Sequence, residues 1–252
     1  MLGVPRIAVL AATLLALLVT GCGGVAFDGL SARATPAPGS KPTRVSPLRD
    51  GRGLHPGLTA ITAAADRAQA RAVIGAVGVR ERDRGGPDYD RDAFGESWTD
   101  DSGAPWAHDG CRTREEVLHR DVRAPTFRPG TDDCVVLDGL LDDPYTGKLI
   151  EFSKSRATQV QIDHVVPLAM AWRQGASGWS EARRTTFAND PLELLAVDGE
   201  ANQEKGASGP AAWLPPNRRV RCAYAVRVAQ VAMKYDLDLP RADRRAMLRQ
   251  CA

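Results

Sequence analysis

Hydrophobic residues recur at helical spacing in several stretches of the chain. An Ala-rich stretch, 60–77, places apolar residues three and four positions apart, which predicts a helix. Residues 113–122 predict another helix, with Thr113 as its N-cap and with Glu115 and Glu116 in the first turn, where acidic side chains favour the helix dipole. Four further segments have the helical pattern: 169–175, 180–187, 218–235 and 241–250.

Short apolar runs between turn-forming residues predict strands instead. Residues 134–137 and 148–152 flank the sequence Asp143-Pro-Tyr-Thr-Gly147, whose proline and glycine are typical of a tight turn. Two more extended runs follow at 160–166 and 192–197. Because helices and strands are both predicted and the strands are few and short, we expect an α+β fold.

One long stretch, 81–110, has no periodicity and is dense in Asp, Gly and Arg. Four aromatic residues are interspersed in it, and we expect their side chains to hold irregular structure in place: Tyr89, Phe94, Trp98 and Trp106.

The N-terminus has the pattern of an export signal. Arg6 precedes an apolar run, 7–19, which is too short for a stable membrane span. The run is followed by Thr-Gly-Cys, so Cys22 stands where a bacterial lipoprotein carries its lipidated first residue. We therefore expect 1–22 to be a lipoprotein-type signal, and the membrane to be a partner through a lipid anchor on its outer face. The alternative is an ordinary secretory peptide with an incidental cysteine.

The stretch after the signal differs in composition from the rest of the chain. Residues 23–58 are rich in Gly, Pro, Ser, Ala and Arg and predict a flexible tether. The remainder, 59–252, is long enough for one domain of ordinary size. The whole chain is 43% hydrophobic and 25% charged, which suits a globular core.

Five cysteines agree with an exported protein. If Cys22 carries the lipid, four remain, an even number that suits disulfides in an oxidising compartment. Three pairings are possible, and closeness in sequence favours Cys111 with Cys134 and Cys222 with Cys251. No Cys-x-x-Cys motif occurs, which argues against a structural zinc site.

The net charge of +2 does not by itself indicate a nucleic-acid partner. Residues 201–252, however, hold ten Lys and Arg against four Asp and Glu, a local charge of +6. Such a tail can face phosphate, or it can be the solvated face of a helix.

The candidate chemistry lies in two segments about forty residues apart. Asp163 and His164 end one predicted strand, and Asn202 lies at the start of a helix that follows the next strand. This order is that of a ββα-metal nuclease centre, in which Asp163 and Asn202 would hold a divalent ion and His164 would act as general base. Oxygen ligands favour Mg²⁺ or Mn²⁺. Lys205, one helical turn after Asn202, could contact phosphate.

Each of these residues also has a structural interpretation. An Asp-His pair is often a structural hydrogen bond, and Asn202 could cap a helix. The other histidines lie outside the motif, and we expect surface or packing roles for them: His55, His108 and His119.

Most of the predicted domain resembles a known family. The segments that match are Tyr89-Asp-Arg91, Gly110-Cys-Arg-Thr-Arg114, Asp143-Pro-Tyr-Thr-Gly-Lys148, Ile162-Asp-His-Val-Val-Pro-Leu168, Phe187-Ala-Asn-Asp-Pro191, Leu194-Leu-Ala-Val197, Asn202-Gln203 and Trp213-Leu-Pro-Pro-Asn217. They resemble the HNH-endonuclease-like family that includes the C-terminal domain of GmrSD-type restriction enzymes, in a secreted actinobacterial branch. The resemblance implies an HNH nuclease core with surrounding helices.

The sequence departs from the family pattern at two positions. Arg112 stands where the family usually has Asp, and Glu193 stands where it usually has the Asn that orients the histidine. Glu193 could replace that Asn as a hydrogen-bond acceptor, and Asn189 is another possible substitute. Arg114 could bind phosphate as a planar fork or form a structural salt bridge near Cys111.

The sequence therefore predicts a monomeric endonuclease that acts on nucleic acid, DNA more than RNA, outside the cytoplasmic membrane. One alternative is a degenerate HNH fold that binds nucleic acid or an envelope partner without cleavage, which the residue Glu193 favours. Another is an unrelated hydrolase with a serine nucleophile, but the chain contains no Gly-x-Ser-x-Gly elbow.

Overall fold

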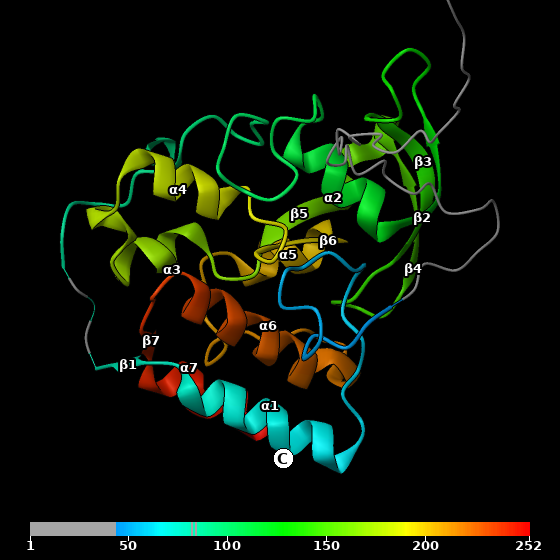
Figure 1. Ribbon diagram of the computed structural model, residues 1–252. Helices are drawn as coiled ribbons and strands as arrows, with labels where there is room; N and C mark the ends of the chain where they lie inside the picture. The colour runs from blue at the N-terminus through cyan, green and yellow to red at the C-terminus, as the bar shows by residue number, and fades with distance from the viewer. Residues whose placement is uncertain (1–43, 82, 84) are drawn as a thin grey trace, which may run out of the picture. The chain divides into compact units, whose positions relative to one another are not determined.

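Figure 1 shows the computed structural model, which describes residues 44–81, 83 and 85–252. The predicted signal, its Cys22 and the tether up to residue 43 lie outside the described residues. The lipid anchor therefore stays a prediction. Within the described part of the chain, no helix is long and apolar enough to cross a membrane.

A two-stranded antiparallel ribbon lies at the centre of the described structure (Figure 1). It consists of β5 (Val160–His164) and β6 (Leu194–Asp198), close to the predicted strands. The helix α5 (Gly199–Lys205) begins directly after β6, because the Asp198 carboxylate accepts a hydrogen bond from the Ala201 amide at 2.9 Å and caps the helix. The predicted order of strand, strand and helix is therefore present.

Both faces of this ribbon are covered. On one face, Ile162 and Ala196 belong to a small apolar core that also contains Leu118 and Phe152. On the other face, Leu195 belongs to the larger core. Because successive side chains of a strand point to opposite faces, this double burial explains why β6 is an unbroken apolar run.

The small core is closed by a three-stranded antiparallel sheet and one helix. The sheet order is β2 (Val122–Phe127), β3 (Val136–Asp142) and β4 (Leu149–Ser153), and the helix is α2 (Thr113–Asp121). The sequence pattern did not predict β2, because Pro125 cannot donate to a ladder. β2 accommodates it at a sheet edge, where the pairing with β3 is irregular.

Two details near this sheet differ from the prediction. Thr113 is the first residue of α2 and not its N-cap: Arg112 takes that position, and the Thr113 hydroxyl donates to the Thr99 carbonyl at 3.0 Å. The strand predicted at 134–137 begins later, at Val136, since the preceding residues form a turn.

The larger core is built on three helices, all close to the predicted positions. α6 (Arg221–Lys234) lies between the ribbon and the pair formed by α1 (Ala64–Ala76) and α7 (Arg241–Gln250) (Figure 1). In the same layer, β1 (Val79–Arg80), which follows α1, pairs in parallel with β7 (Leu239–Pro240), which precedes α7.

The connection from β5 to β6 contains two helices, α3 (Leu168–Arg173) and α4 (Glu181–Ala188). Within the irregular stretch 81–110, Tyr89 and Phe94 pack against these helices through aromatic contacts, as predicted: the rings of Phe94 and Trp172 are 6.0 Å apart. Four short 3₁₀ helices complete the described structure: Asp92–Phe94, Lys154–Gln159, Ala176–Gly178 and Arg218–Val220.

The described end of the predicted tether, residues 44–58, packs against the helical layer. Asp50 is buried and forms an ion pair of 2.9 Å with the buried Arg227 of α6, and Leu58 joins the larger core. Composition alone did not indicate these contacts, because they depend on a charge that lies 177 positions away in the chain.

Two disulfides join the cysteines as predicted. Cys111 pairs with Cys134, and Cys222 pairs with Cys251, which ties the beginning of α6 to the end of α7. The mixture of helices and small, mainly antiparallel sheets confirms the predicted α+β class.

Candidate functional site

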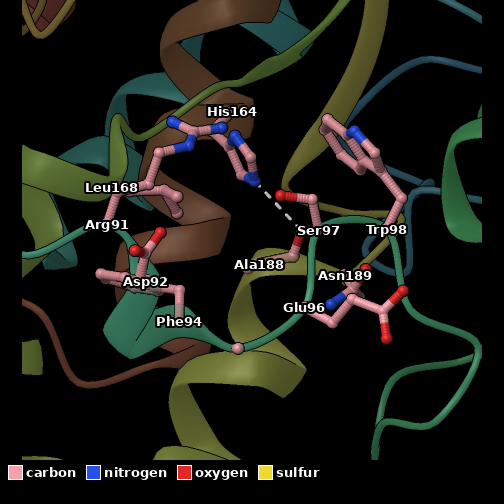
Figure 2. A pocket seen from close by; sticks show the side chains of 11 residues that line it. Arg91, Asp92, Phe94, Glu96, Ser97, Trp98, His164, Leu168, Ala188 and Asn189 are labelled. Atoms are coloured by element: carbon pink, nitrogen blue, oxygen red, sulfur yellow. Dashed lines mark hydrogen bonds between the residues drawn. The ribbon is translucent and has the colours of Figure 1, made fainter.

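His164 is the last residue of β5, and its imidazole is fixed on two sides. The Nε2 atom lies 3.0 Å from the carbonyl oxygen of Ala188, and the ring is stacked on Trp98 at 5.5 Å between centroids (Figure 2). Because a carbonyl can only accept, Nε2 carries the proton of the neutral ring and Nδ1 keeps a free lone pair. The ring thus has a defined orientation and one basic nitrogen.

The surroundings of His164 favour its neutral form. Burial lowers the pKa of the imidazole to about 3; the hydrogen bond to Ala188 opposes this shift, and the cations Arg91 and Lys205 add to it. At neutral pH the imidazole is therefore uncharged, with Nδ1 unprotonated. Trp98 holds its place although its φ of 59° is unusual for a bulky residue, which shows how strongly this loop is constrained.

Asp163 precedes His164 and points to the opposite face of the ribbon. Its Oδ2 accepts a hydrogen bond of 2.5 Å from the Tyr145 hydroxyl, and its Oδ1 lies 2.8 Å from the ammonium of Lys205. Burial raises the pKa of Asp163, whereas Lys205 and Tyr145 oppose that rise. The carboxylate is therefore stabilised by one cation and one hydroxyl.

Asn202 lies on α5, one turn before Lys205. Its amide nitrogen donates to Gln161 Oε1 at 2.9 Å, which leaves the amide oxygen as the atom that can bind a ligand. Gln161 and Asp163 are two positions apart in β5 and so share a face. Contacts of Asn202 with Gln161 and of Lys205 with Asp163 therefore align α5 along this face of the strand.

The three residues predicted to carry the chemistry line one open pocket of about 300 Å³: Asp163, His164 and Asn202. Two oxygen-bearing side chains in a pocket of this size fit a hydrated Mg²⁺ or Mn²⁺, which uses one or two protein ligands and keeps several waters. Across residues 44–81, 83 and 85–252, no three His, Cys, Asp or Glu side chains are grouped so that they could hold a metal ion. A metal ion in this pocket would therefore take most of its coordinating atoms from water and substrate.

The side chains of the two supporting residues, Glu193 and Asn189, form hydrogen bonds with backbone groups. Glu193 is fully buried, and its carboxylate accepts from the Val166 amide at 3.1 and 3.2 Å, just after the histidine. Burial raises its pKa well above the ordinary value. Asn189 donates to the Thr185 carbonyl at 2.9 Å, and its amide oxygen is buried without a partner in the described structure.

The two predicted phosphate contacts lie elsewhere. Lys205 has no exposed side-chain surface, because its ammonium binds Asp163 and the carbonyl oxygen of His164, at 2.8 and 2.7 Å. Arg114, on α2, is not among the residues that line the pocket, and burial lowers its pKa. In the basic tail, Arg227 and Arg241 form ion pairs with acids of the same chain, so part of that charge is used internally.

Sequence reasoning missed three side chains of this site. Tyr145 is buried against Asp163, Trp98 covers the histidine, and Arg91 lines the pocket beside it. Both Arg91 and Trp98 belong to the stretch without periodicity. The signal for Arg91 was its place in a segment that matches the family, and the signal for Trp98 was its place among the aromatic residues of that stretch. Tyr145 lies inside Asp143-Pro-Tyr-Thr-Gly147, a sequence that predicts a turn and matches the family but indicates no role for the tyrosine.

Two comparisons with known proteins bear on the family of this chain. Residues 112–250, more than half of the chain, match the family described as GmrSD restriction endonucleases, C-terminal domain. The chain is also 34% identical over 224 residues to a protein of the fungus Arthroderma benhamiae described as an uncharacterized secreted protein, covering 88% of this chain and 93% of that protein. No solved structure matches it. The family match points to a nuclease-related function, and the chain belongs to the family of GmrSD restriction endonuclease C-terminal domains.

Proposed function

We propose that this protein is an exported, metal-dependent endonuclease with an HNH (ββα-metal) centre. The observation that carries the proposal is the pocket shared by Asp163, His164 and Asn202, at the junction of the β5–β6 ribbon with α5. Membership of a family of restriction-endonuclease domains supports hydrolysis of nucleic acid as the reaction. The secreted relative and the signal-like N-terminus support a location outside the cytoplasmic membrane.

In this proposal His164 is the general base. Its Nε2 is held by Ala188, so Nδ1 is free to take a proton from the attacking water. A bound phosphodiester places negative charge beside the imidazole, which raises its pKa from about 3 toward the working pH. Trp98 keeps the ring in one plane and excludes water from one of its faces.

Asp163 and Asn202 would hold the ion through oxygen atoms. A bound Mg²⁺ or Mn²⁺ would supply charge stabilisation at the phosphate and at the leaving oxygen. Lys205 and Tyr145 position the Asp163 carboxylate, and Gln161 positions the Asn202 amide. In this proposal the site would contact phosphate rather than base edges, so we expect cleavage with little sequence preference. We keep DNA, rather than RNA, as the proposed substrate.

A second function is supported by the charge around Asp163. Both carboxylate oxygens of Asp163 already have hydrogen-bond partners. The ammonium of Lys205 lies 2.8 Å from one of them, and its positive charge would repel a metal ion bound there. Glu193 also replaces the amide that the family usually has. These features favour a degenerate member that binds nucleic acid or an envelope partner without cleavage.

Incubation of residues 23–252 with supercoiled plasmid distinguishes the two functions. We expect nicking with Mg²⁺ or Mn²⁺, no nicking with chelator, and a loss of about 10²–10⁴-fold in His164→Ala. His108→Ala is the matched control, since that imidazole is 67% exposed and does not line the pocket. Binding without nicking by the wild type would support the degenerate function and refute the proposed one.

A further inference from the structure

We propose that Arg91 is the residue that binds the phosphate group of the nucleic acid next to His164. This inference rests on the proposed function and names a substrate contact for it. The ligand class is a phosphodiester, which a guanidinium can bind with two parallel N–H···O bonds.

The position of Arg91 is the first argument. It lines the 300 Å³ pocket together with Asp163, His164 and Asn202, and it also lines a smaller hollow of about 30 Å³ that Trp98 and His164 border. Figure 2 shows its guanidinium beside the imidazole of His164. A phosphate bound by this guanidinium would therefore lie within reach of the base.

The second argument is the absence of an internal carboxylate partner. Nearby arginines are already paired: Arg112 with Glu96 at 2.8 Å and Arg173 with Asp83 at 3.6 Å. Within the described residues, the exposed Arg91 forms no ion pair with a carboxylate. Its positive charge is therefore not held in an ion pair, although the carboxylates of Asp92 and Glu96 line the same smaller hollow.

The third argument is that the backbone on both sides of Arg91 is fixed. The indole nitrogen of Trp172 donates to the Pro87 carbonyl at 2.9 Å, and Arg184 Nε donates to the Ala93 carbonyl at 2.7 Å. Phe94 is buried in the larger core. Because the backbone is already ordered, a ligand that binds Arg91 loses little conformational entropy of the protein.

Neither predicted phosphate contact can take this role in the described arrangement. The ammonium of Lys205 is buried against Asp163, and Arg114 lies outside the pocket. Arg91 thus supplies the cation that phosphate recognition at this pocket requires.

The test measures binding without cleavage. In a His164→Ala background with chelator present, the affinity for a short fluorescein-labelled DNA duplex is measured by anisotropy over a range of salt concentrations. Arg91→Gln should weaken binding and reduce the slope of log K against log salt by about 1, as expected for one lost phosphate contact. Arg91→Lys should keep the slope and regain part of the affinity, since it keeps the charge but not the fork.

Arg71→Gln is the matched control, because Arg71 is an exposed arginine of α1 that lines neither hollow. It should leave both affinity and slope unchanged. Binding by the parent protein with an unchanged slope in Arg91→Gln overturns this inference alone. No binding by the parent protein also overturns this inference, whereas the proposed function is overturned only if the wild type fails to nick plasmid with Mg²⁺ or Mn²⁺.

Discussion

On the two faces of the β5–β6 ribbon, neighbouring residues meet opposite environments. Asp163 points to the more closed face, where its side chain is 6% exposed and contacts Tyr145 and Lys205, although it still lines the 300 Å³ pocket. His164 points to a face where Trp98 and an irregular loop surround it and where two hollows reach its ring. Asp163 and His164 are adjacent in β5, and successive side chains of a strand point to opposite faces, so the two residues meet different surroundings.

We therefore expect residues on the two sides to contribute differently to stability and to activity. On the closed face, charges are satisfied internally, so removing one partner should cost stability. On the side of His164, the imidazole has one hydrogen bond and one ring contact, and Arg91 has no carboxylate partner among the described residues, so substitutions should reduce activity or binding while the fold persists. The stability of the closed face keeps the histidine in place, since Lys205 binds both Asp163 and the His164 carbonyl.

The largest stability effect should follow Lys205→Met. This change leaves the buried Asp163 carboxylate with Tyr145 alone, and breaking a buried pair in this way costs about 3–5 kcal/mol of unfolding free energy. His164→Ala should cost only about 1–2 kcal/mol, for one hydrogen bond and one ring contact. Urea unfolding measures both, and equal losses would contradict the division between the faces.

Glu193→Gln should change how stability depends on pH. Burial raises the pKa of this carboxyl above its ordinary 4.5, although Lys205 nearby opposes the rise and Asp163 adds to it. Above pH 4.5 the unfolded chain releases its proton first, so the folded wild type loses stability as pH rises.

Glutamine removes this loss, so the variant should gain stability relative to the wild type by at most about 1.4 kcal/mol per pH unit. Thermal unfolding at several pH values between about 5 and 8 measures the difference. A constant difference across that range would show that Glu193 is ionised in the folded protein.

The smallest stability effect should follow Trp98→Leu. Loss of the ring stack should cost about 0.5–1.5 kcal/mol, whereas kcat should fall on the order of a hundredfold, because the imidazole is less well oriented. Trp179→Leu is the control: its ring packs on Phe187, away from both hollows, so kcat should persist. A similar kcat in both variants would argue against orientation by Trp98.

Sequence patterns predicted the ribbon and most helices, because periodicity and turn residues are local signals. The linear motif also identified Asp163, His164 and Asn202, which the fold brings to one pocket. The contacts that decide their behaviour depend on distant residues and could not be predicted. The hydroxyl of Tyr145 reaches Asp163 from a turn 18 positions away, and Lys205 reaches it from 42 positions away.

Metal titration of plasmid nicking tests the division between the two faces most directly. Asn202→Ala should raise the Mn²⁺ concentration for half-maximal nicking by about tenfold or more, with activity recovered at high Mn²⁺. His164→Ala should lower the maximal rate about 10²–10⁴-fold at an unchanged metal requirement. An unchanged metal requirement in Asn202→Ala, or wild-type nicking by His164→Ala, would contradict the assignment of these residues.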